Sequence, residues 1–108
     1  MAPLPEFSYV LDNGFGEPVC RLSGDIDLAS IAGLEAAIAA AEEAAPGGRV
    51  VLDMSKVTFL DSTGLKVLVA AHHRSEQDDR RLVLVRPADP VIRILKITGL
   101  FDVMHVDR

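Results

Sequence analysis

The sequence predicts an α/β fold: a single domain with a mixed, mostly parallel sheet, an N-terminal β-hairpin and helices packed on the sheet. After the hairpin, candidate strands alternate with helical stretches in the order β-β-α-β-α-β-α-β, which is typical of parallel sheets. Two strand candidates, 50–52 and 82–85, are continuous aliphatic runs, which indicates strands buried on both faces. The chain has 108 residues, 49% hydrophobic and 25% charged, and this favours one globular domain over residues 1–108.

The hairpin consists of strands expected at residues 7–11 and 19–22. Residues 12–16 between them are rich in Asn and Gly, which tolerate the positive φ angles of turns. Residues 23–27 interrupt the strand pattern, so we expect the second strand to end at Leu22.

The first helix is expected over residues 29–45. Its apolar residues recur at steps of three and four and form one stripe: Ile31, Leu34, Ile38, Ala41 and Ala45. Asp27 can cap its N-terminus, and the Pro-Gly-Gly sequence at 46–48 ends it. The next strand, 49–54, is expected to continue in extended form over 57–60 after a short polar break.

The second helix is expected to open at residues 61–64 and to end near Gln77. Asp61 can accept a backbone N–H of the first turn and so cap the helix. The inner stripe of this helix comprises Leu65, Leu68, Val69 and His72. A strand at 81–85 follows a short polar link.

The third helix is expected to begin with Asp89 as its N-cap and Pro90 as its first helical residue. Its stripe comprises Val91, Ile94 and Leu95. Gly99 followed by Leu100 predicts a Schellman ending, in which the residue after the glycine folds back on the last turn. A short final strand is expected at 104–106.

Composition and charge argue against nucleic acid as the main partner and against a membrane-spanning segment. The net charge is −5, and no run of Lys and Arg would supply the basic patch that phosphate binding needs. Residues 1–6 do not resemble a signal peptide, and the longest apolar runs are far shorter than the roughly 20 residues of a membrane span. We therefore expect a cytoplasmic protein.

The sequence offers little for catalysis or metal binding. His72 and His73 are adjacent, so on a helix they point in different directions, and neither is placed by sequence beside Ser62 or Cys20. We interpret the two as ordinary half-exposed helix histidines and Cys20 as a small buried hydrophobe. No Gly-rich phosphate-binding motif is present. We accordingly expect no catalytic residues, no metal ligands and no cofactor.

Residues 59–65 combine the end of a strand with a hydroxyl-rich helix start. Ser62 and Thr63 lie in the first turn, near the surface, where backbone N–H groups lack partners. A phosphate there would carry about −1.5 to −2 charges and could bind these N–H groups, although Asp61 would repel it. The same four residues, 61–64, also fit a second interpretation, in which they only cap the helix.

Three segments together make the chain resemble a known family: residues 22–27, 59–65 and 97–101, in this order and spacing. The chain resembles the STAS domain family over nearly its whole length. Within that family it is similar to the bacterial anti-sigma factor antagonists, or anti-anti-sigma factors. The resemblance implies the STAS fold and a regulatory binding protein, not an enzyme. Such antagonists bind an anti-sigma factor that is also a serine kinase, and so release a sigma factor that directs transcription.

The resemblance also implies a phosphorylation site. The kinase phosphorylates the serine that follows the aspartate of the motif, here Ser62, and a phosphatase removes the phosphate. Thr63 is the alternative acceptor. The partner-binding residues implied by the resemblance are Asp25, Asp27, Asp61, Ser62, Thr63, Gly64 and Lys66.

Two features depart from the family pattern. Lys66 occupies a position that is commonly glycine in these antagonists, and it lies four residues after Ser62, on the same helix face. The sequence stops at Arg108, so the further C-terminal helix usual in the family is expected to be absent.

Two other functions stay open at this point. A STAS subunit of a membrane transport system, for lipids or anions, would share the fold and much of the sequence at residues 59–65. A nucleotide-binding STAS module is the second alternative, although the sequence places no general base beside Ser62.

Overall fold

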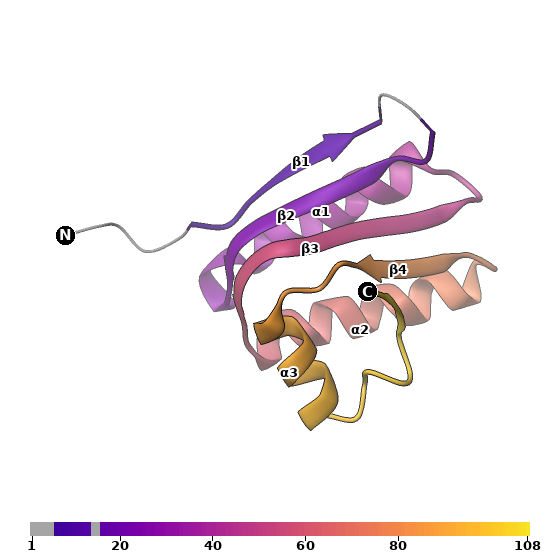
Figure 1. Cartoon of the computed structure of the whole chain (residues 1–108). Helices are drawn as coiled ribbons and strands as arrows, with labels where there is room; N and C mark the ends of the chain where they lie inside the picture. Colours follow the sequence, from indigo (N-terminus) through magenta and orange to yellow (C-terminus); the bar gives the residue numbers. More distant parts are fainter. Residues whose placement is uncertain (1–5, 14–15) are drawn as a thin grey trace.

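Five strands form one sheet whose spatial order follows the sequence, β1-β2-β3-β4-β5 (Figure 1). The strands are β1 (Ser8–Asp12), β2 (Val19–Ile26), β3 (Arg49–Leu60), β4 (Arg81–Val85) and β5 (His105–Asp107). β1 and β2 are antiparallel, and the other neighbours are parallel. The mixed sheet with an N-terminal hairpin is therefore confirmed. The computed structural model describes residues 6–13 and 16–108, so part of the predicted hairpin turn lies outside the described residues.

Three α-helices and one 3-10 turn connect the strands. They are η1 (Leu28–Ser30), α1 (Ile31–Ala44), α2 (Ser62–Gln77) and α3 (Asp89–Ile97). Helices α1 and α2 pack against each other, with α1 on the first three strands and α2 on β4, whereas α3 packs on β3. In Figure 1, α1 and α2 lie behind the sheet, and α3 lies at the end of the sheet where β3 leads into α2. None of the described helices has the length and apolar character needed to cross a lipid bilayer.

The core lies between the sheet and the helices and is mainly aliphatic. Residues 50–54 of β3 and 82–84 of β4 are buried without interruption, as the continuous aliphatic runs predict. The helices contribute buried side chains to this core: Leu34, Ile38, Leu65, Leu68, Val91 and Leu95. Val69 and Ile94 were also predicted for inner stripes, but both are only half-buried at the margin of the core.

Cys20 is fully buried in β2, as predicted. Its thiol donates a long hydrogen bond to the carbonyl oxygen of Ala37 in α1 (3.6 Å). Burial raises the pKa of this thiol to about 11, so the side chain behaves as a small hydrophobe.

Strand β2 continues to Ile26, so the predicted end at Leu22 is wrong. Gly24 has φ of +89°, and a Cβ there would overlap the carbonyl group of Glu6. The register with β3 shifts beside Gly24, which marks a β-bulge. The polar residues at 23–25 interrupt the local pattern, but pairing with β3 holds them in extended conformation.

Strand β3 is one element of 12 residues, not two pieces separated by a break. Arg21 of β2 pairs with Asp53, whereas Ser23 pairs with Lys56, so β3 carries one extra residue between these pairs. This second bulge accommodates the exposed Ser55 and Lys56 within the strand.

Several other element boundaries differ from the predictions by one or two residues. The 3-10 turn η1 precedes α1, and Asp27 caps this turn instead of the α-helix itself. The N-cap of α3 is Ala88, so Asp89 and Pro90 are its first two helical residues. Helix α1 ends at Ala44, and β5 begins one residue later than predicted. Such shifts follow from the hydrogen bonding of terminal turns, which sequence patterns locate poorly.

The C-terminal end of α3 has the predicted Schellman geometry. Gly99 has φ of +77°, and its N–H donates to the carbonyl oxygen of Lys96 at 3.2 Å. The N–H of Leu100 donates to the carbonyl oxygen of Leu95 at 2.9 Å. Leu100 packs at the margin of the core, as the motif requires.

The interpretation of both histidines as half-exposed is wrong for His72, whereas the place of His72 in the inner stripe of α2 is confirmed. His73 is exposed, but His72 is buried on the inner side of α2. Adjacent helix positions point about 100° apart, so one of the two can face the sheet while the other faces solvent.

Candidate functional site

The ends of β2 and β3 lie side by side at one edge of the sheet. These two strands are parallel, and Ile26 pairs with Leu60. The N–H of Asp61 donates to the carbonyl oxygen of Ile26 at 3.1 Å, which ties the two strand ends together. Asp27 and Asp61, each the first residue after its strand, therefore belong to the same edge. This is the carboxyl edge, where open α/β sheets place their binding sites.

Asp61 caps α2, as predicted. One carboxylate oxygen, Oδ1, accepts hydrogen bonds from the backbone N–H groups of Thr63 and Gly64, both at 3.0 Å. Partial burial alone would raise the pKa of Asp61, but these hydrogen bonds and one from the Thr63 hydroxyl outweigh it. The pKa of Asp61 therefore lies below its usual value, and the carboxylate is charged at neutral pH.

The two hydroxyls that follow Asp61 have different surroundings. The Thr63 hydroxyl donates to Oδ1 of Asp61 at 2.5 Å and is half-buried. Ser62 is the first residue of α2 and is exposed, and no hydrogen bond to its hydroxyl occurs within the described part of the chain. Only the Ser62 hydroxyl is free to meet another molecule without breaking the helix cap.

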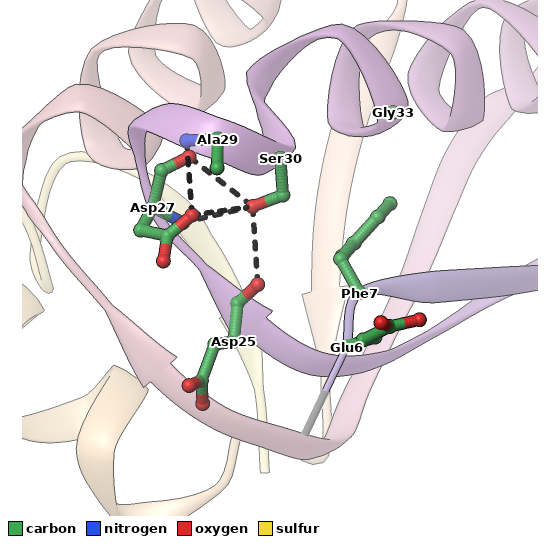
Figure 2. A pocket seen from close by; sticks show the side chains of 7 residues that line it. All are labelled: Glu6, Phe7, Asp25, Asp27, Ala29, Ser30 and Gly33. Atoms are coloured by element: carbon green, nitrogen blue, oxygen red, sulfur yellow. Dashed lines mark hydrogen bonds between the residues drawn. The ribbon is translucent and has the colours of Figure 1, made fainter. Parts of the chain in front are cut away.

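Asp61 and Asp27, the acidic residues that join β3 to α2 and β2 to η1, form two acidic junctions. The junction at Asp27 is a small hydrogen-bond network (Figure 2). The Asp27 carboxylate accepts from the N–H of Ala29 at 3.0 Å, and the Ser30 hydroxyl accepts from the N–H of Asp27 at 2.9 Å. These reciprocal bonds form a capping box. The carboxylate of Asp25 points away from this network in Figure 2 and accepts from the Thr58 hydroxyl of β3 at 2.5 Å.

A shallow hollow of about 430 Å³ lies beside this junction. It is lined by Glu6, Phe7, Asp25, Asp27, Ala29, Ser30 and Gly33, which are the side chains drawn in Figure 2. Sequence reasoning predicted Asp25 and Asp27 here but missed Ser30 and Thr58. An Asp-x-x-Ser spacing at residues 27–30 was the available signal for Ser30, whereas Thr58 reaches Asp25 only across the sheet.

Lys66 does not join the acidic junctions. Its exposed side chain lines a groove between α1 and α2, together with Glu35, Glu42 and Arg74. The structure therefore brings Asp25, Asp27, Asp61 and the first turn of α2 to one edge and leaves Lys66 one turn further along α2.

Exposed apolar side chains lie at the same end of the sheet, and sequence reasoning did not identify them. Phe59 is 47% exposed and Ile97 77% exposed. Both line a second hollow of about 290 Å³, together with Leu60, Pro90, Arg93 and Ile94. This apolar surface, formed by Phe59, Ile94 and Ile97, adjoins the strand end that carries Asp61. Buried apolar contacts supply much of the free energy of protein–protein binding.

Comparison with known proteins identifies the family of this chain. The model of the STAS domain matches residues 12–108. The chain belongs to the STAS family. Curated relatives of this STAS domain include the anti-sigma-B factor antagonist of Staphylococcus aureus, which is 30% identical over 88 residues, or 81% of this chain and 80% of that protein. The anti-sigma-B factor antagonist of Listeria monocytogenes is 38% identical over 55 residues, or 51% of this chain and 48% of that protein.

Solved structures support the same family. A crystal structure of an anti-sigma factor antagonist from Mycobacterium paratuberculosis is 30% identical and superposes with a TM-score of 0.74, covering 94% of this chain and 86% of that one. The Bacillus cell-fate determinant SpoIIAA, in its phosphorylated form, shares 21% identity with a TM-score of 0.66, covering 94% and 92%. At this identity the second comparison shows a common fold. The relatives from Staphylococcus aureus, Listeria monocytogenes and Mycobacterium paratuberculosis are named for antagonism of another protein and not for a reaction.

Proposed function

We propose that this STAS domain is an anti-sigma factor antagonist that binds a kinase-type anti-sigma factor through the surface around Ser62. Phosphorylation of Ser62 ends this binding, and a phosphatase restores it. The relatives that share 30% identity over most of the chain carry the name of anti-sigma factor antagonist, which supports this class of partner. The observation that carries the proposal is the exposed Ser62 hydroxyl, without a partner in the described residues, at a helix start capped by Asp61 on the sheet edge that also carries Asp27.

The choice of Ser62 over Thr63 rests on hydrogen bonding. The Thr63 hydroxyl is held by Asp61, and the same carboxylate oxygen caps the backbone. Transfer of a phosphoryl group to Thr63 would break this bond and place the new charge against the Asp61 carboxylate. Ser62 has no such bond to lose among the residues that the structure describes.

The switch itself is electrostatic. A phosphate on Ser62 would add about −1.5 to −2 charges to a surface that already holds the charged Asp61 carboxylate and the nearby Asp27. A partner that binds the unmodified surface would have to desolvate this added charge and face its repulsion. A penalty of about 1.4 kcal/mol weakens binding tenfold, so a modest repulsion suffices for regulation.

The apolar surface of Phe59, Ile94 and Ile97 supplies the binding free energy in this proposal. It lies on β3 and α3, next to the strand end that leads into Ser62. A partner that covers it would also meet the acidic junctions at its rim. A partner with apolar side chains framed by basic ones fits this surface best.

The acceptor is tested by incubating the chain with a candidate kinase-type anti-sigma factor and ATP, followed by intact-mass measurement and site mapping. We expect one phosphoryl group per chain, absent from Ser62→Ala and retained in Thr63→Val. Ser8→Ala is the control, because Ser8 is an exposed serine on β1, away from α2. Full phosphorylation of Ser62→Ala would contradict the assignment.

The switch is tested by measuring the affinity of the same partner for two size-matched variants. Ser62→Asp should bind at least about tenfold more weakly than Ser62→Asn, because only the aspartate adds a charge. Equal affinities of the two folded variants would overturn the electrostatic switch. Phe59→Ala and Ile97→Ala should each weaken binding, whereas Val103→Ala, at another exposed apolar residue, should leave it unchanged.

A further inference from the structure

A group of three side chains that the proposed function does not use lies between α2 and the edge strand β5. His72 and Glu76 are four residues apart on α2 and share one face of the helix, and His105 is the first residue of β5. His105 lies beside them because β5 pairs with β4, on which α2 packs. Nε2 of His105 is 3.2 Å from Oε1 of Glu76, and Nε2 of His72 is 3.8 Å from the same oxygen.

The spacing of these atoms is close to that of ligands around one metal ion. One ligand atom from each residue can be chosen so that all three lie within 4.8 Å of one another. Two ligands about 2.0–2.1 Å from a tetrahedral zinc ion are roughly 3.3 Å apart. The distances to Glu76 are already close to this value, and rotation of the partly exposed His105 side chain can bring the two histidines closer together. Two imidazoles and one carboxylate form a ligand set that suits zinc and similar divalent transition metals.

The burial of His72 provides the second observation. Its side chain is only 7% exposed, and no hydrogen bond reaches its ring from the described residues. Nδ1 is fully enclosed without a partner, while Nε2 faces Glu76 at a distance too long for a hydrogen bond. An ion pair explains why Glu76 lies beside His105, but it leaves the buried ring of His72 unsatisfied. A metal ion on Nε2 would give this buried ring a polar partner at Nε2, while Nδ1 would still lack one among the described residues.

The exposure of the other two residues leaves one side of the group open. Glu76 is 49% and His105 31% exposed, so water can complete the coordination of an ion held by three protein ligands. The lack of an acceptor for Nδ1 of His72 sets a limit on affinity, because a missing outer hydrogen bond typically weakens metal binding by about 10–100-fold. Micromolar affinity is therefore expected, not nanomolar.

We propose that His72, Glu76 and His105 bind one divalent transition-metal ion, with zinc as the best fit, and that this ion clamps β5 onto α2. His72 lies ten residues after Ser62, about 15 Å along the helix, so the metal site is separate from the surface around Ser62. The clamp strengthens the attachment of a three-residue edge strand, whose backbone pairing involves β4 alone in the described structure.

The test uses the full chain without a histidine tag, stripped of metal with a chelator, at pH 7.5, where free imidazole is mostly neutral. Zinc titration in competition with a chromophoric chelator should give one ion per chain with micromolar affinity. The melting temperature should rise with zinc concentration, because the ion binds the folded state. Cobalt(II) should give the intense visible absorption of a four-coordinate site.

Variants at the two partly exposed ligands separate this site from adventitious binding. His105→Ala and Glu76→Gln should each weaken zinc binding at least about tenfold, with their folds checked by circular dichroism. His73→Ala is the matched control, since His73 is an exposed histidine next to His72 but outside the group, and its affinity should equal that of the unmodified chain. Binding only at millimolar zinc, or unchanged affinity in folded His105→Ala, would overturn the proposal.

Discussion

Gly64 in α2 lies directly against Ile26 in β2. A Cβ on Gly64 would come within 2.5 Å of Cγ2 of Ile26 and within 2.8 Å of Cδ1 of Leu60. The third residue of α2 therefore has to be glycine for reasons of space, not of backbone conformation. This close approach presses the first turn of α2 onto the ends of two strands, and so sets the position of Ser62.

Gly64→Ala should destabilise the domain. The added methyl group has to displace Ile26 and Leu60, both buried, and such overpacking costs about 1–3 kcal/mol. Gly48→Ala is the control, because the nearest atom to a Cβ there, among the described residues, is 3.8 Å away. Urea denaturation of both variants measures the two costs. A free energy of unfolding for Gly64→Ala equal to that of Gly48→Ala would show that the packing here is looser than the structure indicates.

Leu68→Ala should remove a central part of the core. Leu68 is fully buried where α2 packs on the sheet, and such truncations cost about 2–5 kcal/mol. Leu28→Ala makes the same change at an exposed leucine and should cost less than about 0.5 kcal/mol. Thermal or chemical unfolding tests both variants, and a similar loss in the two would contradict the assigned inner face of α2.

The cap of α2 should make stability depend on pH through Asp61. The pKa of Asp61 is lower in the folded chain than in the unfolded chain, because the folded carboxylate accepts hydrogen bonds from Thr63 and Gly64. A group of this kind stabilises the fold fully above its unfolded pKa, about 3.9, and this contribution is lost as pH falls through the folded pKa.

Asp61→Ala should therefore cost about 0.5–2 kcal/mol at neutral pH, as for other lost N-caps. The difference in unfolding free energy between the unmodified chain and Asp61→Ala should narrow between about pH 6 and about pH 3, since the carboxylate becomes protonated. Urea denaturation at several pH values measures this difference, in which the titration of the other acids largely cancels. A difference that grows as pH falls would contradict the direction of the pKa shift.

Lys66 should pair with the phosphate in the phosphorylated chain. It lies one turn after Ser62, and an exposed pair of this kind is worth about 0–1 kcal/mol. Lys66→Gln should therefore lower the melting temperature of the phosphorylated form more than that of the unmodified form. Lys56→Gln, at an exposed lysine on β3, should shift both forms equally. Equal shifts in melting temperature for Lys66→Gln in the two forms would contradict the pairing of Lys66 with the phosphate.

The features that were predictable from sequence are those that depend on residues close together in the chain. The aliphatic runs of β3 and β4, the cap at Asp61 and the Schellman ending at Gly99 were all correct. Each depends on the local hydrogen bonding or periodicity of a few consecutive residues. The resemblance to the STAS family likewise followed from short motifs in order, and the family match confirms it.

Errors arose where distant segments decide the conformation. The polar residues at 23–25 remain in β2 because β3 pairs with them, and Gly24 accommodates the backbone at Glu6. The local pattern around residues 23–25 contains no information about these neighbours. His72 is different, because helix periodicity placed it in the inner stripe of α2, where it is buried, and only its interpretation as half-exposed was wrong.

The sequence alone therefore determined the order of the elements, most of the core and the position of Ser62 at a helix start. Only the tertiary structure decided that Asp27 and Asp61 share one edge, that Phe59 and Ile97 stay exposed beside it, and that His105 meets the α2 pair of His72 and Glu76. The physical reason is the range of the interactions: helix periodicity and caps act over a few residues, whereas strand pairing and packing join residues 29 to 34 positions apart.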